Sequence, residues 1–190
     1  MILTIRRLFE PQMRAGLSRT AKLGLTPVVL VMALTLISGP IQASEQPLYV
    51  DKFRDWSLYS YEVDQGKVCY IASRPTKEEG DYTRRGPAAV LVSRWPIDES
   101  REQVSVQPGY NYLSDSLVSM KIDGTEFELF TKGEHAWAST TDQDAQIIQS
   151  MKKGQVMAIR GTSTKKTYSL DSYSLLGFTA AYQAMQDVCK

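Results

Sequence analysis

The chain has 190 residues, with 22 Lys or Arg against 21 Asp or Glu and a formal net charge of +1. This balance, without a basic stretch interleaved with aromatic residues, argues against nucleic acid and against an anionic membrane surface as the main partner. The single histidine of the chain excludes a histidine-rich metal site.

The N-terminus predicts a signal peptide. Five basic residues and one acidic residue precede an apolar run from Leu25 to Ile37. That run has the length of a signal-peptide core and falls short of the roughly 20 residues that a membrane-spanning helix needs. Ala43 is the small residue before the expected cut, so residues 1–43 form the predicted signal peptide. An uncleaved anchor or a buried core helix is the alternative.

Residues 44–190 then form the mature protein, in the periplasm or outside the cell. Loss of residues 1–43 removes a net charge of +4 and leaves the remaining 147 residues at −3. A chain of this size buries roughly 70% of its unfolded surface in one core. Because no repeat, low-complexity tract or linker divides it, we expect a single domain.

The two cysteines predict a disulfide, because an exported protein folds in an oxidising compartment. Near the C-terminus, Phe178, Tyr182, Met185 and Cys189 are four, three and four residues apart, so a helix would carry Cys189 on its apolar stripe. Cys69 lies in a strand-like segment. A bond between the two would hold the last helix against an early strand. Two buried free thiols are the alternative.

Beyond the signal peptide the chain contains mainly short strands. Residues 55–63 and 66–73 predict an opening hairpin, and residues 155–164 and 165–175 predict a second strand pair. Residues 86–96 are apolar at both alternating sets of positions, which predicts a central strand covered on both faces.

The clearest local pattern is a hairpin centred on Asp123 and Gly124. An Asp-Gly pair favours a two-residue turn because both central residues need positive φ. This turn sets a register in which side chains of compatible chemistry lie opposite one another. The expected cross-strand pairs are Ile122 with Thr125, Met120 with Phe127, Val118 with Leu129 and Lys121 with Glu126.

Two helices complete the predicted elements. One follows Thr140, whose spacing from Gln143 is that of a capping box, and Gly154 can end it. The other is the C-terminal helix with Cys189. The predicted fold class is therefore mainly β with two helices (α+β), as a compact antiparallel β-sandwich or barrel-like domain with a C-terminal helix. Residues 74–87, which are charged and contain Pro and Gly, predict a long mobile loop.

Catalytic motifs are missing from the sequence. We interpret His135 as a turn or strand-edge residue and not as a general base, because no Gly-x-Ser-x-Gly elbow accompanies it. Ser150 with Lys153 and Ser163 with Lys166 match the pattern Ser-x-x-Lys. That pattern is short enough to occur by chance and its companion motifs are absent, so we interpret both pairs as solvated polar residues. We expect no catalytic residue.

Metal and cofactor sites are not predicted either. Asp142 and Asp144 lack the glycine and the distal glutamate of a calcium-binding loop, and they suit a helix N-terminus instead. No phosphate loop or dinucleotide fingerprint occurs. We therefore expect neither a metal nor a cofactor.

Four aromatic residues are candidates for a binding surface: Tyr110, Tyr112, Trp95 and Trp137. Exposed aromatic rings mark an interface only when they form a patch. The interpretation that we favour is structural, with the tyrosine rings packed over a sheet edge beside the Pro-Gly turn that precedes them.

Seven segments of the chain, in order, resemble the invasion-associated locus B family of alphaproteobacteria. They are FRDWSLYSYE, KVCYIASRP, RRGPAAVLVSRWP, QVSVQPGYNY, FELFTKGEHAW, MKKGQVMAIRGTSTKKTYSLDSYSLLGFTAA and the terminal VCK, and they span most of residues 53–190. The resemblance implies an exported envelope protein with a mostly β fold and no established biochemical activity. The link of the family to invasion of host cells comes from one representative.

The resemblance also bears on the cysteines. Other branches of the family have a cysteine four residues after the tryptophan and a further pair in the middle of the chain. Here the first of these positions is Ser60 and the middle segment LFTKGEHAWAST has no cysteine. This chain therefore departs from the disulfide pattern of those branches, and the resemblance leaves Cys69 with Cys189 as the pair.

Two classes of function follow. We favour a non-catalytic exported protein that binds an envelope component or a partner protein of unknown identity, and the family name adds a host surface to the partners. The alternative is a small periplasmic enzyme whose site has no recognisable motif. An exposed aromatic patch would favour binding, whereas a cleft that gathers His135 with carboxylates or serines would favour catalysis.

Overall fold

Eleven antiparallel strands form one sheet in the part of the chain that the structure, a computed structural model, describes: residues 46–96 and 102–189. The strands are β1 (Leu48–Phe53), β2 (Trp56–Val63), β3 (Gly66–Ser73), β4 (Lys77–Gly80), β5 (Ala89–Arg94), β6 (Glu102–Gln107), β7 (Leu117–Ile122), β8 (Thr125–Lys132), β9 (His135–Trp137), β10 (Val156–Thr162) and β11 (Tyr168–Ser174). The predicted signal peptide lies outside the described residues.

The order of strands across the sheet is β1-β2-β3-β5-β6-β9-β8-β7-β10-β11-β4. The sheet does not close, because β1 and β4 each have a neighbour on one side only. The described residues belong to one compact unit. The predicted fold class, mainly β with two helices and a C-terminal helix, is confirmed, and the sheet is an open one rather than a closed barrel.

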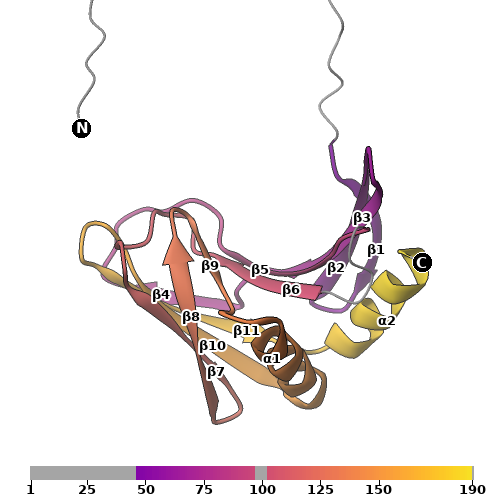
Figure 1. Cartoon of the computed structure of the whole chain (residues 1–190). Coiled ribbons are helices and arrows are strands. Elements are labelled where there is room, and N and C mark those ends of the chain that lie inside the picture. The colour runs from indigo at the N-terminus through magenta and orange to yellow at the C-terminus, as the bar shows by residue number, and fades with distance from the viewer. Residues whose placement is uncertain (1–45, 97–101, 190) are drawn as a thin grey trace, which may run out of the picture. The chain divides into compact units, whose positions relative to one another are not determined.

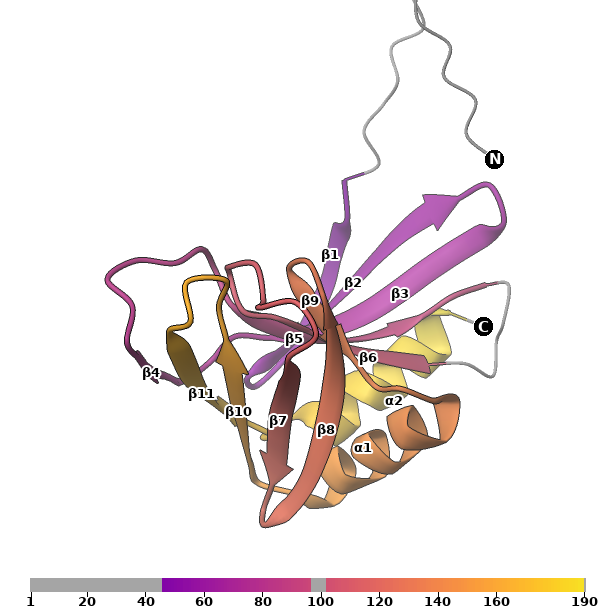
Figure 2. The same ribbon diagram turned by 60° about the vertical axis from the view of Figure 1, so that its left-hand side comes forward.

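The two helices, α1 (Thr141–Lys153) and α2 (Phe178–Val188), lie side by side on one side of the bent sheet (Figures 1 and 2). Their buried residues, among them Ile147, Met151, Phe178 and Met185, join the inward-facing side chains of the strands in one hydrophobic cluster. Burial of that many large apolar side chains is the main stabilising contribution of the fold. No described helix has the length and apolar character needed to cross a membrane.

The strand pairings that the sequence predicts are present. β2 pairs with β3 from Ser57 opposite Ala72 to Val63 opposite Gly66, and β10 pairs with β11 along its whole length. β5 lies between β3 and β6, as expected of a central strand. The prediction that β5 is covered on both faces is wrong: Val90 is buried but Leu91 is only partly so. Both described helices lie on one side of the sheet, so neither of them covers its outer face (Figure 1).

The β7–β8 hairpin has the predicted turn and register. Asp123 and Gly124 have φ of 42° and 103°, and every expected cross-strand pair is observed. The carboxylate of Asp123 also accepts hydrogen bonds from the backbone N–H groups of Gln155 at 2.8 Å and Val156 at 3.1 Å. The turn residue therefore also holds the hairpin against the start of β10.

Helix α1 begins and ends as the sequence predicts. Thr140 Oγ1 accepts from the backbone N–H of Gln143 at 3.1 Å, and Gly154 is the C-cap. Asp142 and Asp144 lie in its first turn, where acids are favourable. Asp144 is also buried, and its Oδ1 accepts from the backbone N–H of Val104 in β6 at 2.8 Å.

Both ends of helix α2 are attached to the part of the sheet that contains β1 and β3. It begins after Gly177, whose φ is 90° and whose hypothetical Cβ would lie 2.0 Å from the carbonyl oxygen of Phe53. At its other end Cys189 forms a disulfide with Cys69 on β3, with a Cα–Cα distance of 6.0 Å. The structure thus joins the two cysteines that the sequence pairs, and Cys189 lies on the buried side of the helix end.

Candidate functional site

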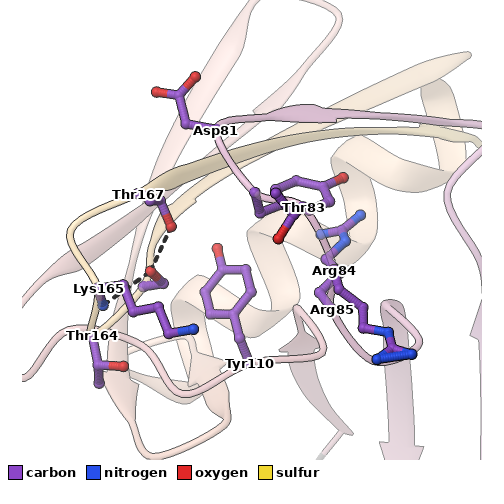
Figure 3. Close-up of a pocket in the computed structure, with 10 residues that line it drawn as sticks. Asp81, Thr83, Arg84, Arg85, Tyr110, Thr164, Lys165 and Thr167 are labelled. Atoms are coloured by element: carbon purple, nitrogen blue, oxygen red, sulfur yellow. Dashed lines mark hydrogen bonds between the residues drawn. The ribbon is translucent and has the colours of Figure 1, made fainter.

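A pocket of about 260 Å³ lies where two loops meet at one end of the sheet (Figure 3). One loop follows β4, the other joins β10 to β11, and Tyr110 lies between them. The residues that line the pocket are Asp81, Tyr82, Thr83, Arg84, Arg85, Tyr110, Ser163, Thr164, Lys165 and Thr167.

The segment that forms the first wall of the pocket differs from its predicted structure. Residues 74–87 are not a long mobile loop, because they contain β4, which pairs with β11 from Lys77 opposite Ser172 to Gly80 opposite Ser169. The sequence pattern conceals this strand, since all four of its residues are exposed and three are charged. Charged side chains on an edge strand disfavour pairing with a further chain.

Arg85 holds the rest of this wall in place. Its side chain is 3% exposed and forms two hydrogen bonds to the carboxylate of Asp171, one of them at 2.7 Å from Nη1 to Oδ2. It also contacts Glu78 at 3.2 Å and lies 4.8 Å from the centre of the Tyr82 ring. Burial alone would lower the pKa of Arg85, but the hydrogen bonds and charges of Asp171 and Glu78 outweigh it and raise the pKa above its ordinary value.

The base of the pocket is aromatic. The Tyr110 ring packs edge-on against Tyr112 with 5.5 Å between centroids, and its hydroxyl lies 2.7 Å from Ser169 Oγ. Burial raises the pKa of Tyr110, so the hydroxyl stays neutral. Close packing of Tyr112 requires Gly161, where an added Cβ would lie 2.5 Å from the Tyr112 ring. Tyr110 is therefore held rigidly from below and presents its other side to the pocket.

The second wall is a tight turn. Ser163 Oγ lies 2.7 Å from Thr167 Oγ1 and accepts from the backbone N–H of Lys165 at 3.1 Å (Figure 3). Ser163 is 6% exposed, so the interpretation of the Ser163–Lys166 pair as solvated residues is wrong for the serine. Its hydroxyl closes the turn through local hydrogen bonds, an arrangement typical of Ser and Thr at turns.

The charge of the pocket is positive. Arg84 and Lys165 come from opposite walls, and neither forms an ion pair with a described residue. Figure 3 shows the Lys165 side chain directed toward Tyr110, whereas the carboxylate of Asp81 points away from the ring. The Lys165 ammonium group therefore approaches the base of the pocket, and Arg84 adds a second cation to the lining.

His135 and Trp137 lie elsewhere, on β9. The His135 ring stacks on the Trp137 ring with 5.3 Å between centroids, and Trp137 also contacts Phe130. This packing fits the interpretation of His135 as a strand-edge residue. Phe130 is 41% exposed and Leu117, its cross-strand neighbour, is 54% exposed, so these side chains form a small apolar strip on the outer face.

The four candidate aromatic residues do not share one surface position. Tyr110 lines the pocket, but Tyr112 is 3% exposed and belongs to the core. Trp95 is 42% exposed and lies beside Cys189 at the far end of β5. Within the described ranges, no group of three or more His, Cys, Asp or Glu is arranged to hold a metal ion.

Comparison with known proteins identifies the family. The family model "Invasion associated locus B (IalB) protein" matches residues 56–186. The chain belongs to the invasion-associated locus B family. A solved structure, invasion associated protein B from Bartonella henselae, is 16% identical, matches 74% of this chain and 97% of its own, and superposes with a TM-score of 0.52. At that identity the likeness concerns the fold. No curated protein matches.

Membership of the invasion-associated locus B family makes the chain an exported bacterial protein, and a disulfide fits that assignment. The pocket was not foreseen from the sequence. Tyr110 was a candidate, but Arg84 and Arg85 belong to residues 74–87, which were predicted as a mobile loop, and Lys165 begins residues 165–175, which were predicted as a strand. The Tyr-Thr-Arg-Arg and Lys-Lys sequences of the two loops are the available signal, and only the pairing of β4 with β11 brings them together.

Proposed function

We propose that this member of the invasion-associated locus B family is a periplasmic or secreted, non-catalytic protein that binds an envelope component in the pocket between residues 81–85 and 163–167. The pocket itself carries the proposal. It has rigid walls, an aromatic base and convergent polar groups, which are the common features of binding sites.

Contacts around the pocket support binding rather than catalysis. Ser163 uses its hydroxyl to close a turn, Tyr110 shares its hydroxyl with Ser169, and His135 is stacked on Trp137 away from the pocket residues. A nucleophile needs a base within hydrogen-bond reach, and these three groups are otherwise engaged.

Thr83→Trp tests the pocket. Thr83 is exposed and lines the pocket, so an indole side chain fills the space without entering the core. Immobilised wild-type protein should retain an envelope component that Thr83→Trp does not retain. Thr141→Trp, at the exposed first residue of α1, is the matched control and should behave as wild type. Equal retention by Thr83→Trp and wild type would show that the pocket is not the binding site.

His135→Ala tests the absence of catalysis. We expect no activity in a hydrolase screen of the purified protein that disappears in His135→Ala while the circular dichroism spectrum is unchanged. Such an activity would replace the binding function by an enzymatic one.

Export is tested separately. Mass spectrometry of the periplasmic fraction should find a chain that begins near Ser44. An intact N-terminus recovered from the inner membrane would show that residues 1–43 anchor the protein instead.

Host-cell binding, which the family description suggests, is examined with the same Thr83→Trp variant on intact cells.

A further inference from the structure

We infer that the pocket binds an acidic saccharide, meaning a sugar ring that carries a carboxylate or a phosphate. This inference rests on the proposed function and specifies the ligand of the same site. Three observations carry it: the two lining cations that form no ion pair with a described residue, the tyrosine rings, and the hydroxyl groups of the walls.

The charges require an anion. Of the three cations in the pocket lining, Arg85 is committed to Asp171 and Glu78, whereas Arg84 and Lys165 form no ion pair with described residues. The whole mature chain is acidic by sequence, at a formal −3, so this local excess of positive charge is not a general property of the surface. Guanidinium and ammonium groups form their strongest hydrogen bonds with carboxylates and phosphates.

The aromatic and hydroxyl groups require more than a simple ion. Tyr110 and Tyr82 provide ring surfaces, and Thr83, Thr164 and Thr167 bring hydroxyl groups to the walls. A sugar presents apolar C–H groups on its ring faces and hydroxyl groups around its edge, so it matches both. An inorganic anion would leave the rings without contacts. Aromatic side chains with a polar end suit such mixed surfaces.

The size of the pocket limits the ligand. Its volume of about 260 Å³ lies just below the range of roughly 300–1,000 Å³ that is typical of ligand pockets. The site therefore takes one sugar unit, which can be a free molecule or the end of a longer glycan. Tyr110 forms the floor of the pocket and sets its depth, because contacts with Tyr112 and Ser169 fix the position of its ring.

Isothermal titration calorimetry with the purified protein tests the ligand class. The probes are glucuronate, glucose 6-phosphate, glucose and inorganic phosphate. Both acidic sugars, or the one whose anion fits, should bind at least about tenfold more tightly than glucose, because hydrogen bonds to charged groups are stronger than those between neutral groups. They should also bind more tightly than phosphate. The two acidic probes distinguish a carboxylate from a phosphate ligand.

Three variants identify the groups responsible. Lys165→Gln and Arg84→Gln should each weaken binding of the acidic sugar about tenfold and leave the weak binding of glucose unchanged. Lys166→Gln is the matched control, because Lys166 is adjacent and exposed but does not line the pocket. It should retain wild-type affinity. All three positions are exposed, so the fold should survive, which a thermal unfolding curve verifies.

The outcomes separate this inference from the proposed function. If Thr83→Trp abolishes retention of the envelope component but acidic and neutral sugars bind alike, or not at all, the ligand class is wrong and the pocket remains a binding site. If Lys165→Gln and Arg84→Gln bind the acidic sugar as wild type does, the ligand assignment is also overturned. If Thr83→Trp changes nothing, both proposals fail.

Discussion

Arg85 and Asp171 are 86 residues apart in the sequence and form a two-point ion pair in which each side chain is 3% exposed. This pair fastens the loop after β4 to β11 beneath the pocket. Removing one member would leave the other as a buried charge with an incomplete set of partners, which is more costly than losing an exposed ion pair. The same contact therefore determines both local stability and the shape of the pocket.

Asp171→Asn should lower the free energy of unfolding by about 3 kcal/mol, measured by urea denaturation. The value lies at the lower end of the range for broken buried ion pairs because Glu78 still contacts Arg85 at 3.2 Å. The control is Glu79→Gln, which breaks an exposed contact with Lys77 and should cost no more than about 1 kcal/mol. Equal effects of the two substitutions would contradict the structural role of the buried pair.

The double variant Arg85→Met/Asp171→Leu extends this test. It removes both charges and should be more stable than Asp171→Asn, because no uncompensated charge stays buried. Binding to the pocket should still decrease, since the wall loses its anchor. A double variant less stable than the single one would show that the ion pair stabilises the fold beyond satisfying its own charges.

Cys69→Ser should lower the free energy of unfolding by about 2 to 5 kcal/mol, because the bond closes a loop with a sequence separation of 120 residues. The backbone N–H groups of α2 should exchange with solvent before those of the sheet, since an isolated helix of this length is marginal in water. Arg94, which donates to the carbonyl of Cys189 at 3.2 Å, retains part of the attachment. Two titratable thiols per chain in unreduced periplasmic material would contradict the bond.

Asp123→Ala should cost about 1 to 3 kcal/mol, more than an ordinary exposed substitution. The change removes a carboxylate that accepts two backbone hydrogen bonds from residues 155 and 156, and it places alanine at a φ of 42°. Asp123→Asn keeps one acceptor oxygen and tolerates this φ, so it should cost less. If both variants unfold at the same urea concentration, the contact with β10 contributes nothing.

Alkaline pH should destabilise the protein partly through Tyr182. Burial, followed by the hydrogen bond to Glu102, raises the pKa of this hydroxyl to about 12, whereas an unfolded tyrosine titrates near 10. The native state therefore holds its proton longer, and stability is lost as pH rises from about 10 toward 12. Tyr182→Phe should show a shallower fall in the free energy of unfolding between pH 9 and 11. An unchanged slope would assign the effect to other tyrosines.

Local structure could be predicted from the sequence because its causes lie within a few residues. The Asp123–Gly124 turn fixed its own register, and Thr140 and Gly154 set the ends of α1. The pairing of Cys69 with Cys189 has a different basis, because it spans 120 residues and followed from having two cysteines in an exported chain. Turn geometry, helix capping and disulfide chemistry were the physical grounds of these three predictions.

Only the tertiary structure decided the pocket. Residues 74–87 have no hydrophobic period that would mark β4 as a strand, and its order comes from pairing with β11 and from the buried contact of Arg85 with Asp171. A sequence shows an arginine in a charged loop, and solvation is its ordinary state. Burial of Arg85 is favourable because β11, which is distant in the sequence, places Asp171 opposite it. The position of a charge relative to its partner is a property of the fold, and here that position shapes the pocket.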